Sequence, residues 1–202
     1  MIRIKMCGLR RPEDIAAANE TGPEYIGFVF AEKSRRRVSA AEAETLRANL
    51  REGITPVGVF VNAGIGTVAG LLEQGVIDMA QLHGEEDEAY IAALRARTNR
   101  PLIQAFRIRS GEDIRRAEAS SADMILLDAG AGDGRTFDWS LLRYAKRPFF
   151  LAGGLTPENV GEAVETLQPF GVDVSSGIET EGYKDPIKMR AFLRAVREKG
   201  NR

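Results

Sequence analysis

Two glycine-rich segments in the last third of the chain carry most of the information about the fold: Leu151-Ala-Gly-Gly-Leu-Thr-Pro-Glu-Asn159 and Val172-Asp-Val-Ser-Ser-Gly-Ile178. Each begins as a short apolar strand and then turns through glycine. Such turns let backbone N–H groups approach an anion closely, and a helix that starts beside them adds a favourable dipole. Two of them after successive strands predict a phosphate site. Its candidate residues are Gly153, Gly154, Ser175, Ser176 and Gly177.

The same order, a short apolar run followed by a longer amphipathic run, occurs eight times along the chain. The apolar runs are rich in Ile, Val, Leu and Phe, which is typical of strands covered on both faces. The strand candidates are Arg3–Cys7, Tyr25–Phe30, Pro56–Val61, Met79–Leu82, Leu102–Phe106, Met124–Asp128, Phe149–Ala152 and Val172–Ser175.

Several of the intervening helices have readable start signals. Ser39-Ala-Ala-Glu42 is a capping box, and Ser110-Gly-Glu-Asp113 is a similar one with Asp in place of Glu. Thr156-Pro157 and Asp185-Pro186 each place an N-cap residue before a proline at the first helical position. The last helix is predicted to end at Gly200, which suits the residue just past a helix C-terminus.

Strands that alternate with helices pair in parallel through right-handed crossovers, and eight such units can form a closed barrel or an open sheet. No Gly-x-Gly-x-x-Gly fingerprint follows the first strand, as an open dinucleotide-binding sheet would prefer. The glycine turns instead follow the seventh and eighth strands, where barrels often bind phosphate. We therefore predict an α/β fold, a single (β/α)8 TIM barrel that forms one domain over residues 1–202.

Composition narrows the function classes. The 28 basic and 29 acidic residues leave a net charge of −1, so we expect neither a nucleic-acid partner nor binding to an anionic membrane. One cysteine and one histidine exclude an intrachain disulfide and argue against a zinc site. The first residues lack the apolar region of a signal peptide, and no apolar run approaches the ~20 residues that span a bilayer. We expect a cytoplasmic protein with no bound metal.

Active-site groups of such barrels lie at the C-terminal ends of the strands, where this chain has Cys7 and Asp128. Both groups can transfer protons. Strands one and six lie three steps apart around a ring of eight, so the two side chains would face each other across the mouth as a base and an acid. Position alone leaves a simpler interpretation open for each residue. Cys7 could be a buried apolar side chain, and Asp128 could be a loop or helix-capping carboxylate.

The charged run Lys33-Ser-Arg-Arg-Arg37 follows the second strand. Such runs are usually solvated loops, but one arginine could turn inward and hold a carboxylate in a bidentate fork. His83 follows the fourth strand. It is a candidate substrate contact, although a single histidine at a strand end is more often a hydrogen-bonded structural residue.

The order of motifs resembles the phosphoribosylanthranilate isomerase family along essentially the whole chain. Lys5-Met-Cys-Gly-Leu9 is similar to the family's opening Lys-Ile-Cys-Gly motif. The other matching segments, in order, are Gly27–Phe30 with Lys33, Ser34 and Arg36, then Gln81–Gly84, Leu127-Asp128 with Thr136–Trp139, Leu151–Leu155 and Val172–Gly177. Arg35 and Arg37 stand where the family commonly has Pro and Tyr, which leaves open which of the three arginines faces the substrate.

The resemblance implies an Amadori rearrangement of N-(5-phosphoribosyl)anthranilate to 1-(2-carboxyphenylamino)-1-deoxyribulose 5-phosphate in tryptophan biosynthesis. It implies that Cys7 is the general base, Asp128 the general acid and Arg36 the ligand of the anthranilate carboxylate. The glycines and serines of the two turns would surround the phosphate. The partner would be this small phosphorylated sugar, without metal or cofactor, and the protein would be a monomer or homodimer.

Two alternatives remain at this stage. A related phosphoribosyl isomerase of histidine biosynthesis, or a dual-substrate version, would share the fold, but the histidine-pathway family has aspartate where this chain has Cys7. A non-catalytic phosphosugar-binding barrel would keep the glycine turns without needing a Cys/Asp pair. Turnover of the anthranilate substrate distinguishes all three.

Two finer expectations concern charge. Alternation along the first strand puts Lys5 on the inward face with Cys7, so Lys5 needs a buried partner, for which Asp173 on the eighth strand is the candidate. The proposed roles also need a low pKa for the Cys7 thiol and a high pKa for Asp128. We expect nearby Lys5 to lower the first, and a water-poor mouth with a bound phosphate to raise the second.

Overall fold

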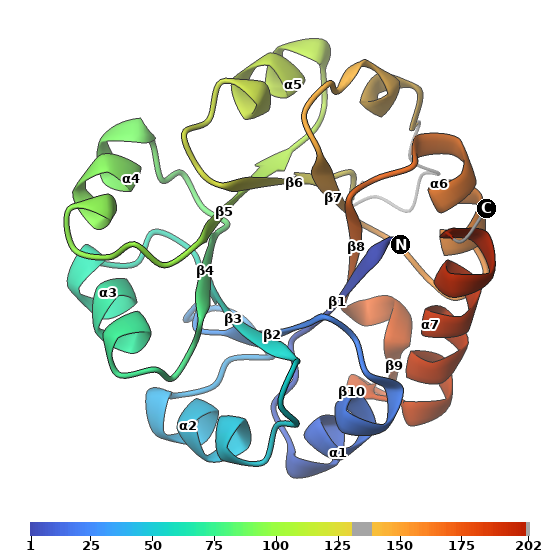
Figure 1. Ribbon diagram of the computed structural model, residues 1–202, viewed down its shortest axis with the longest axis horizontal. Coiled ribbons are helices and arrows are strands. Elements are labelled where there is room, and N and C mark those ends of the chain that lie inside the picture. The colour runs from blue at the N-terminus through green and yellow to red at the C-terminus, as the bar shows by residue number, and fades with distance from the viewer. Residues whose placement is uncertain (131–138, 201–202) are drawn as a thin grey trace.

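Eight parallel strands close into a barrel in chain order, as the sequence predicts (Figure 1). The computed structural model describes residues 1–130 and 139–200. The strands are β1 (Arg3–Cys7), β2 (Tyr25–Val29), β3 (Thr55–Phe60), β4 (Met79–Leu82), β5 (Leu102–Arg107), β6 (Met124–Asp128), β7 (Phe149–Ala152) and β8 (Gly171–Val174). The predicted bounds of β2, β3, β5 and β8 differ from these by one residue. Pairing of β1 with β8 closes the ring.

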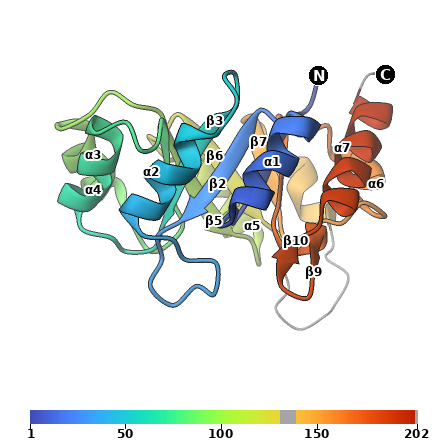
Figure 2. The same cartoon turned by 90° about the horizontal axis from the view of Figure 1, so that it is seen from below.

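Helices surround the barrel on its outside (Figure 1). They are α1 (Pro12–Thr21), α2 (Ala40–Ala48), α3 (Ile65–Glu73), α4 (Glu88–Arg95), α5 (Gly111–Glu118), α6 (Val160–Leu167) and α7 (Pro186–Gly200), with short 3-10 helices η1 (Trp139–Tyr144) and η2 (Ser176–Ile178). A small hairpin of β9 (Glu179–Thr180) and β10 (Tyr183–Lys184) lies between β8 and α7, at the face opposite the two chain ends (Figure 2). Among the described residues, no helix has the length and apolarity to cross a membrane.

The predicted capping boxes are present at α2 and α5, where Glu42 and Asp113 accept from the backbone N–H groups of Ser39 and Ser110. The predicted start of α6 is wrong. Asn159, rather than Thr156, is the N-cap residue. Its side chain accepts from the Thr156 N–H at 2.8 Å and donates to the Gly154 carbonyl at 3.0 Å, which holds the preceding residues in a turn.

The last helix also differs at its end, because Gly200 is its final residue rather than the residue after it. A Cβ at Gly200 would lie 2.8 Å from the Ile2 side chain, so close packing on the N-terminal segment explains glycine there. The start of α7 after Asp185 is as predicted.

The strands alternate between two apolar layers. Outward-facing side chains such as Ile4, Met6 and Ile26 pack with the helices in the larger core. A separate inner cluster fills the barrel, with Val57, Met79, Ile103, Ala105, Leu126, Phe150 and Ala152. Because this filling closes the barrel interior, a substrate can reach only the ends of the strands.

The ion pair of Lys5 and Asp173 lies inside this filling. The sequence predicts this pair, because Lys5 faces inward and needs a buried partner. Lys5 is fully buried, and its Nζ lies 2.9 Å from Asp173 Oδ1. The two residues are directly opposite each other in the β1–β8 register. Burial lowers the pKa of Lys5, but the charges of Asp173 and Cys7 outweigh burial and raise it. The predicted pairing is confirmed, and Lys5 is held as a cation.

Replacing Asp173 with Asn should destabilise the fold by about 3–5 kcal/mol, because the Lys5 ammonium would remain buried without its counter-charge. The free energy of urea unfolding measures this. The Glu198→Gln variant is the matched control, since it breaks the exposed Arg194–Glu198 pair on α7 and should change little. A loss below about 1 kcal/mol for Asp173→Asn would contradict this role for the pair.

Candidate active site

A cavity of about 250 Å³ lies at the C-terminal ends of the strands. Eight of the nine candidate site residues from the sequence line it: Cys7, Arg36, His83, Asp128, Gly153, Gly154, Ser175 and Ser176. The ninth, Gly177, packs against the β7–α6 turn, where a Cβ would overlap the Leu155 carbonyl. A larger groove of about 910 Å³ lies between the β2–α2 loop and α3. That groove is lined by neither Cys7 nor Asp128, so the smaller cavity is the candidate active site.

Cys7 ends β1 and is 7% exposed. Gly27 on β2 makes room for the thiol, since a Cβ there would lie 2.7 Å from Cys7 Sγ. The Ser175 hydroxyl donates to the Cys7 carbonyl at 3.0 Å, which ties the ends of β1 and β8 together. Burial raises the pKa of the Cys7 thiol by more than Lys5 lowers it. The expected low pKa is therefore wrong, and Cys7 is a thiol at neutral pH.

Asp128 ends β6, on the other side of the cavity. Its Oδ1 accepts from the Gly130 N–H at 2.8 Å, and its Oδ2 lies 3.5 Å from His83 Nε2. Burial raises the pKa of Asp128, but the hydrogen bonds from His83 and Gly130 and electrostatic interactions with His83 and Arg107 lower it overall. Burial acts in the expected direction, but the sequence did not reveal His83 and the Gly130 N–H as partners, and with them the pKa of Asp128 is lowered, so that it is a carboxylate at neutral pH.

His83 is fixed through both ring nitrogens. Gln81 Nε2 lies 2.8 Å from His83 Nδ1, and the other nitrogen faces Asp128. If the Gln81 amide donates, the histidine proton is on Nε2 and points at Asp128. His83 is therefore both a hydrogen-bonded strand-end residue and a lining residue of the cavity.

The first of the two glycine turns has the backbone that the sequence suggests, whereas Gly177 in the second turn does not have a positive φ. Gly153 and Gly154 have φ angles of +98° and +64°, in the left-handed region that favours glycine. A Cβ at Gly153 would overlap the backbone of Gly130, so the β7 turn packs directly on the β6 turn. Ser175 and Ser176 follow β8 and lead into η2. Residues of both turns thus line one side of the cavity.

Of the three consecutive arginines, Arg36 lines the cavity. Its side chain is 18% exposed, against 70% for Arg35, and Arg37 lies on the larger groove. The Arg36 side chain passes over Gly8, where a Cβ would lie 2.5 Å from Arg36 Cδ. The Gly8 that follows the cysteine therefore leaves room for the arginine.

Sequence reasoning missed two charged residues beside the site, Glu179 and Lys184 on the β9–β10 hairpin. Glu179 accepts from Arg36 Nε at 2.6 Å and from Arg36 Nη2 at 2.7 Å. Lys184 Nζ lies 2.7 Å from Glu179 and donates to the Ser175 carbonyl at 2.9 Å. The only sequence signal was their position shortly after the second glycine turn.

A profile of the N-(5′-phosphoribosyl)anthranilate isomerase family matches residues 4–195. The chain is 43% identical to the enzyme of that name from Endomicrobium trichonymphae, over 98% of this chain and 99% of the relative. It is 44% identical to that from Caldanaerobacter subterraneus, with 98% of each chain covered.

The chain belongs to the N-(5′-phosphoribosyl)anthranilate isomerase family.

Solved structures of phosphoribosylanthranilate isomerases agree with this family membership. The crystal structure from Thermotoga maritima superimposes with a TM-score of 0.90 at 34% identity, over 98% of this chain and all of that one. Another, at TM-score 0.87, 35% identity and the same coverage, is a complex with reduced 1-(o-carboxyphenylamino)-1-deoxyribulose 5-phosphate. Of the family-like segments noted in the sequence, Thr136–Asp138 lies outside the described residues.

Proposed function

We propose that this chain converts N-(5-phosphoribosyl)anthranilate to 1-(2-carboxyphenylamino)-1-deoxyribulose 5-phosphate in tryptophan biosynthesis, with Cys7 as base and Asp128 as acid. The observation that carries the assignment of roles is that Cys7 and Asp128 line one cavity from opposite sides of the barrel, at the ends of β1 and β6. Family membership favours this reaction over the histidine-pathway isomerase and over a non-catalytic barrel. We place the enzyme in the cytoplasm, as one domain over residues 1–202, monomeric or homodimeric.

In this proposal, each part of the cavity recognises one part of the substrate. The turns after β7 and β8 bind the phosphate through Gly153, Gly154, Ser175 and Ser176, with Gly177 packed behind them against the β7–α6 turn, and Arg36 binds the anthranilate carboxylate. Asp128 then protonates the ring oxygen of the sugar, and the furanose opens to a Schiff base. Cys7 removes the proton from C2, and the resulting enolamine tautomerises to the ketone. Chemistry of this kind needs correctly placed acid and base groups rather than a cofactor.

The protonation states that these pKa directions give are the reverse of those that the reaction needs. Burial keeps Cys7 protonated, while hydrogen bonds keep Asp128 ionised. A phosphate dianion at the two glycine turns would raise both pKa values, which helps the acid and hinders the base. The reactive form has a Cys7 thiolate and an Asp128 carboxylic acid. It holds the same number of protons as the form with a Cys7 thiol and an Asp128 carboxylate. The reactive protonation state is then the less populated of two states, which differ only in whether Cys7 or Asp128 holds the proton.

This arrangement predicts a broad, bell-shaped pH profile of kcat/KM. Activity should rise with pH as Asp128 loses its proton, below its ordinary value of 3.8, and fall only as Cys7 ionises, above its ordinary value of 9.0. These are apparent values of the pair. A profile of kcat/KM against pH measures both limbs. An alkaline limb below about pH 8 would contradict the raised pKa of Cys7.

Cys7→Ser and Asp128→Asn should each lower kcat by about 10²–10⁴-fold, because a hydroxyl is a far weaker acid than a thiol and an amide has no proton to donate. Steady-state kinetics with the anthranilate substrate tests both. Each variant should still bind the reduced product analogue, since neither group is assigned to phosphate or carboxylate. Retention of more than about a tenth of the rate would remove that residue from its role.

Arg36→Met should weaken substrate binding by about 1.5–3 kcal/mol, the usual contribution of a charge-assisted bidentate contact. The dissociation constant of the reduced product analogue measures the change. Arg35→Met is the matched control, because Arg35 is mostly exposed on the same loop. A larger effect from Arg35 or Arg37 would show that a different arginine holds the carboxylate.

A further inference from the structure

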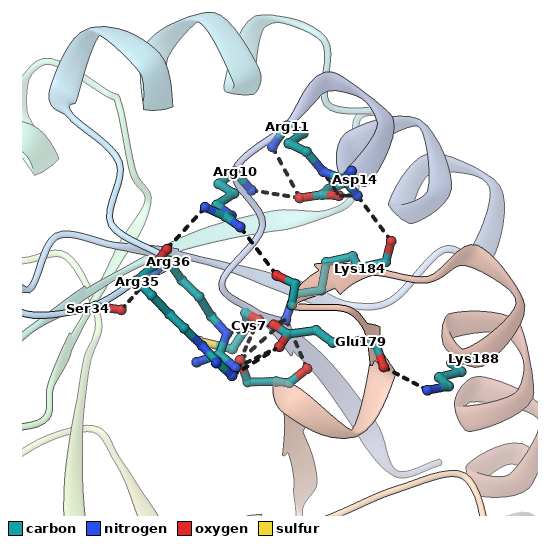
Figure 3. A network of polar contacts seen from close by, with 12 residues as sticks. Cys7, Arg10, Arg11, Asp14, Ser34, Arg35, Arg36, Glu179, Lys184 and Lys188 are labelled. Atoms are coloured by element: carbon teal, nitrogen blue, oxygen red, sulfur yellow. Dashed lines mark hydrogen bonds and ion pairs between the residues drawn. The ribbon is translucent and has the colours of Figure 1, made fainter.

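The carboxylate of Glu179 is the centre of a buried group of charges at the rim of the cavity (Figure 3). Its side chain is 5% exposed and contacts Arg36 from the β2–α2 loop and Lys184 from the adjacent strand β10. Burial raises the pKa of Glu179, but the hydrogen bonds and charges of these two cations lower it to about 2. Glu179 is therefore ionised throughout the working range of pH and always available to its partners.

The contact uses only one edge of the Arg36 guanidinium. Nε and Nη2 donate to the two oxygens of Glu179 at 2.6 and 2.7 Å. A guanidinium has a second edge, formed by Nη1 and the other N–H of Nη2, which can hold another carboxylate at the same time. Among residues 1–130 and 139–200, no side chain or carbonyl accepts from that second edge. Arg36 thus has a bound edge and an edge available to a ligand.

Lys184 fixes the position of the carboxylate itself. Its side chain is 1% exposed, and its Nζ contacts Glu179 at 2.7 Å and the Ser175 carbonyl at 2.9 Å. Ser175 in turn donates to the Cys7 carbonyl. The chain of contacts therefore runs from the ends of β1 and β8 to the guanidinium on the β2–α2 loop. Arg36 and Lys184 surround the Glu179 carboxylate, and the mostly exposed Arg35 lies 3.8 Å from it. Positive charge is therefore in excess around Glu179, which suits an incoming carboxylate.

We propose that Glu179 is a positioning residue that grips one edge of Arg36 and presents the other edge to the aromatic carboxylate of the substrate. This inference rests on the proposed role of Arg36. Without the Glu179 charge, the Arg36 and Lys184 cations would repel each other, and the arginine would lose its fixed orientation. Glu179 touches no reacting atom, so it should affect recognition of the carboxylate and not the proton transfers.

The test compares two substrates, N-(5-phosphoribosyl)anthranilate and N-(5-phosphoribosyl)aniline, which lacks the carboxylate. Glu179→Gln should raise KM for the first by about tenfold or more, the scale of a lost charge-assisted contact, and leave its kcat within about twofold. Its kcat and KM for the aniline substrate should not change, which also shows that the variant is folded. Glu179→Asp keeps the charge and should recover part of the affinity. Glu181→Gln, at an exposed position of the same hairpin, is the matched control.

A double variant shows whether the effect passes through Arg36. Arg36→Met/Glu179→Gln should bind the anthranilate substrate no more weakly than Arg36→Met alone. An unchanged or lower KM in Glu179→Gln would overturn the proposal, and a lower one would mean that Glu179 competes with the substrate for Arg36. Equal losses on both substrates would also overturn it, as the sign of a merely structural role. Failure of the proposed function looks different: no turnover in the wild type, or an Arg36→Met variant with unchanged preference for the carboxylate.

Discussion

The pairing of β1 with β8 is the constraint on which the rest of the structure depends. It joins the first strand of the chain to the last strand of the barrel, and its register puts Lys5 directly opposite Asp173. The ion pair between them is buried in a largely apolar filling, so a shifted register would separate a buried cation from its counter-charge. Cys7 lies two residues beyond Lys5 at the end of β1, and Ser175 lies two residues beyond Asp173, just after the end of β8. The same register therefore brings together the proposed base and the proposed phosphate turn.

Closure of the barrel also explains why the candidate catalytic and binding residues all lie at one face of the barrel. Parallel strands place all their C-terminal ends at the same rim, and the filled interior gives a substrate no other entry. The β9–β10 hairpin lies at that rim, because it directly follows β8, and it adds Glu179 and Lys184 to a site otherwise made from strand ends and loops. A segment of a few residues thus supplies the partner that orients Arg36.

The sequence could predict the barrel because strands covered on both faces have a distinctive composition, and eight of them were found to within one residue at each end. It also predicted the Lys5–Asp173 pair, since alternation fixes the inward face and closure makes the two strands neighbours. It could not predict β9 and β10, whose two-residue strands are too short to show a period. The Arg36–Glu179 contact joins residues 143 positions apart, and nothing local in the chain marks either as the other's partner. The α6 start was missed because the Asn159 side chain holds a turn that a Thr-Pro signal alone does not reveal.

The directions of the pKa shifts of Cys7 and Asp128 could not be predicted from the sequence, for a different reason. Cys7 and Asp128 are each subject to opposing influences, burial against neighbouring groups, and only the distances decide which is larger. Burial is the largest influence on the pKa of Cys7 and raises it; the Lys5 charge lowers the pKa, but the Asp173 charge raises it again, and burial prevails. At Asp128 the Gly130 N–H and His83 prevail over burial. Burial at Cys7 and hydrogen bonding at Asp128 thus both favour a protonation state other than the one that the reaction needs. A site built around internally paired charges therefore keeps its geometry fixed before the substrate binds, and the cost is that one proton must move before catalysis can begin.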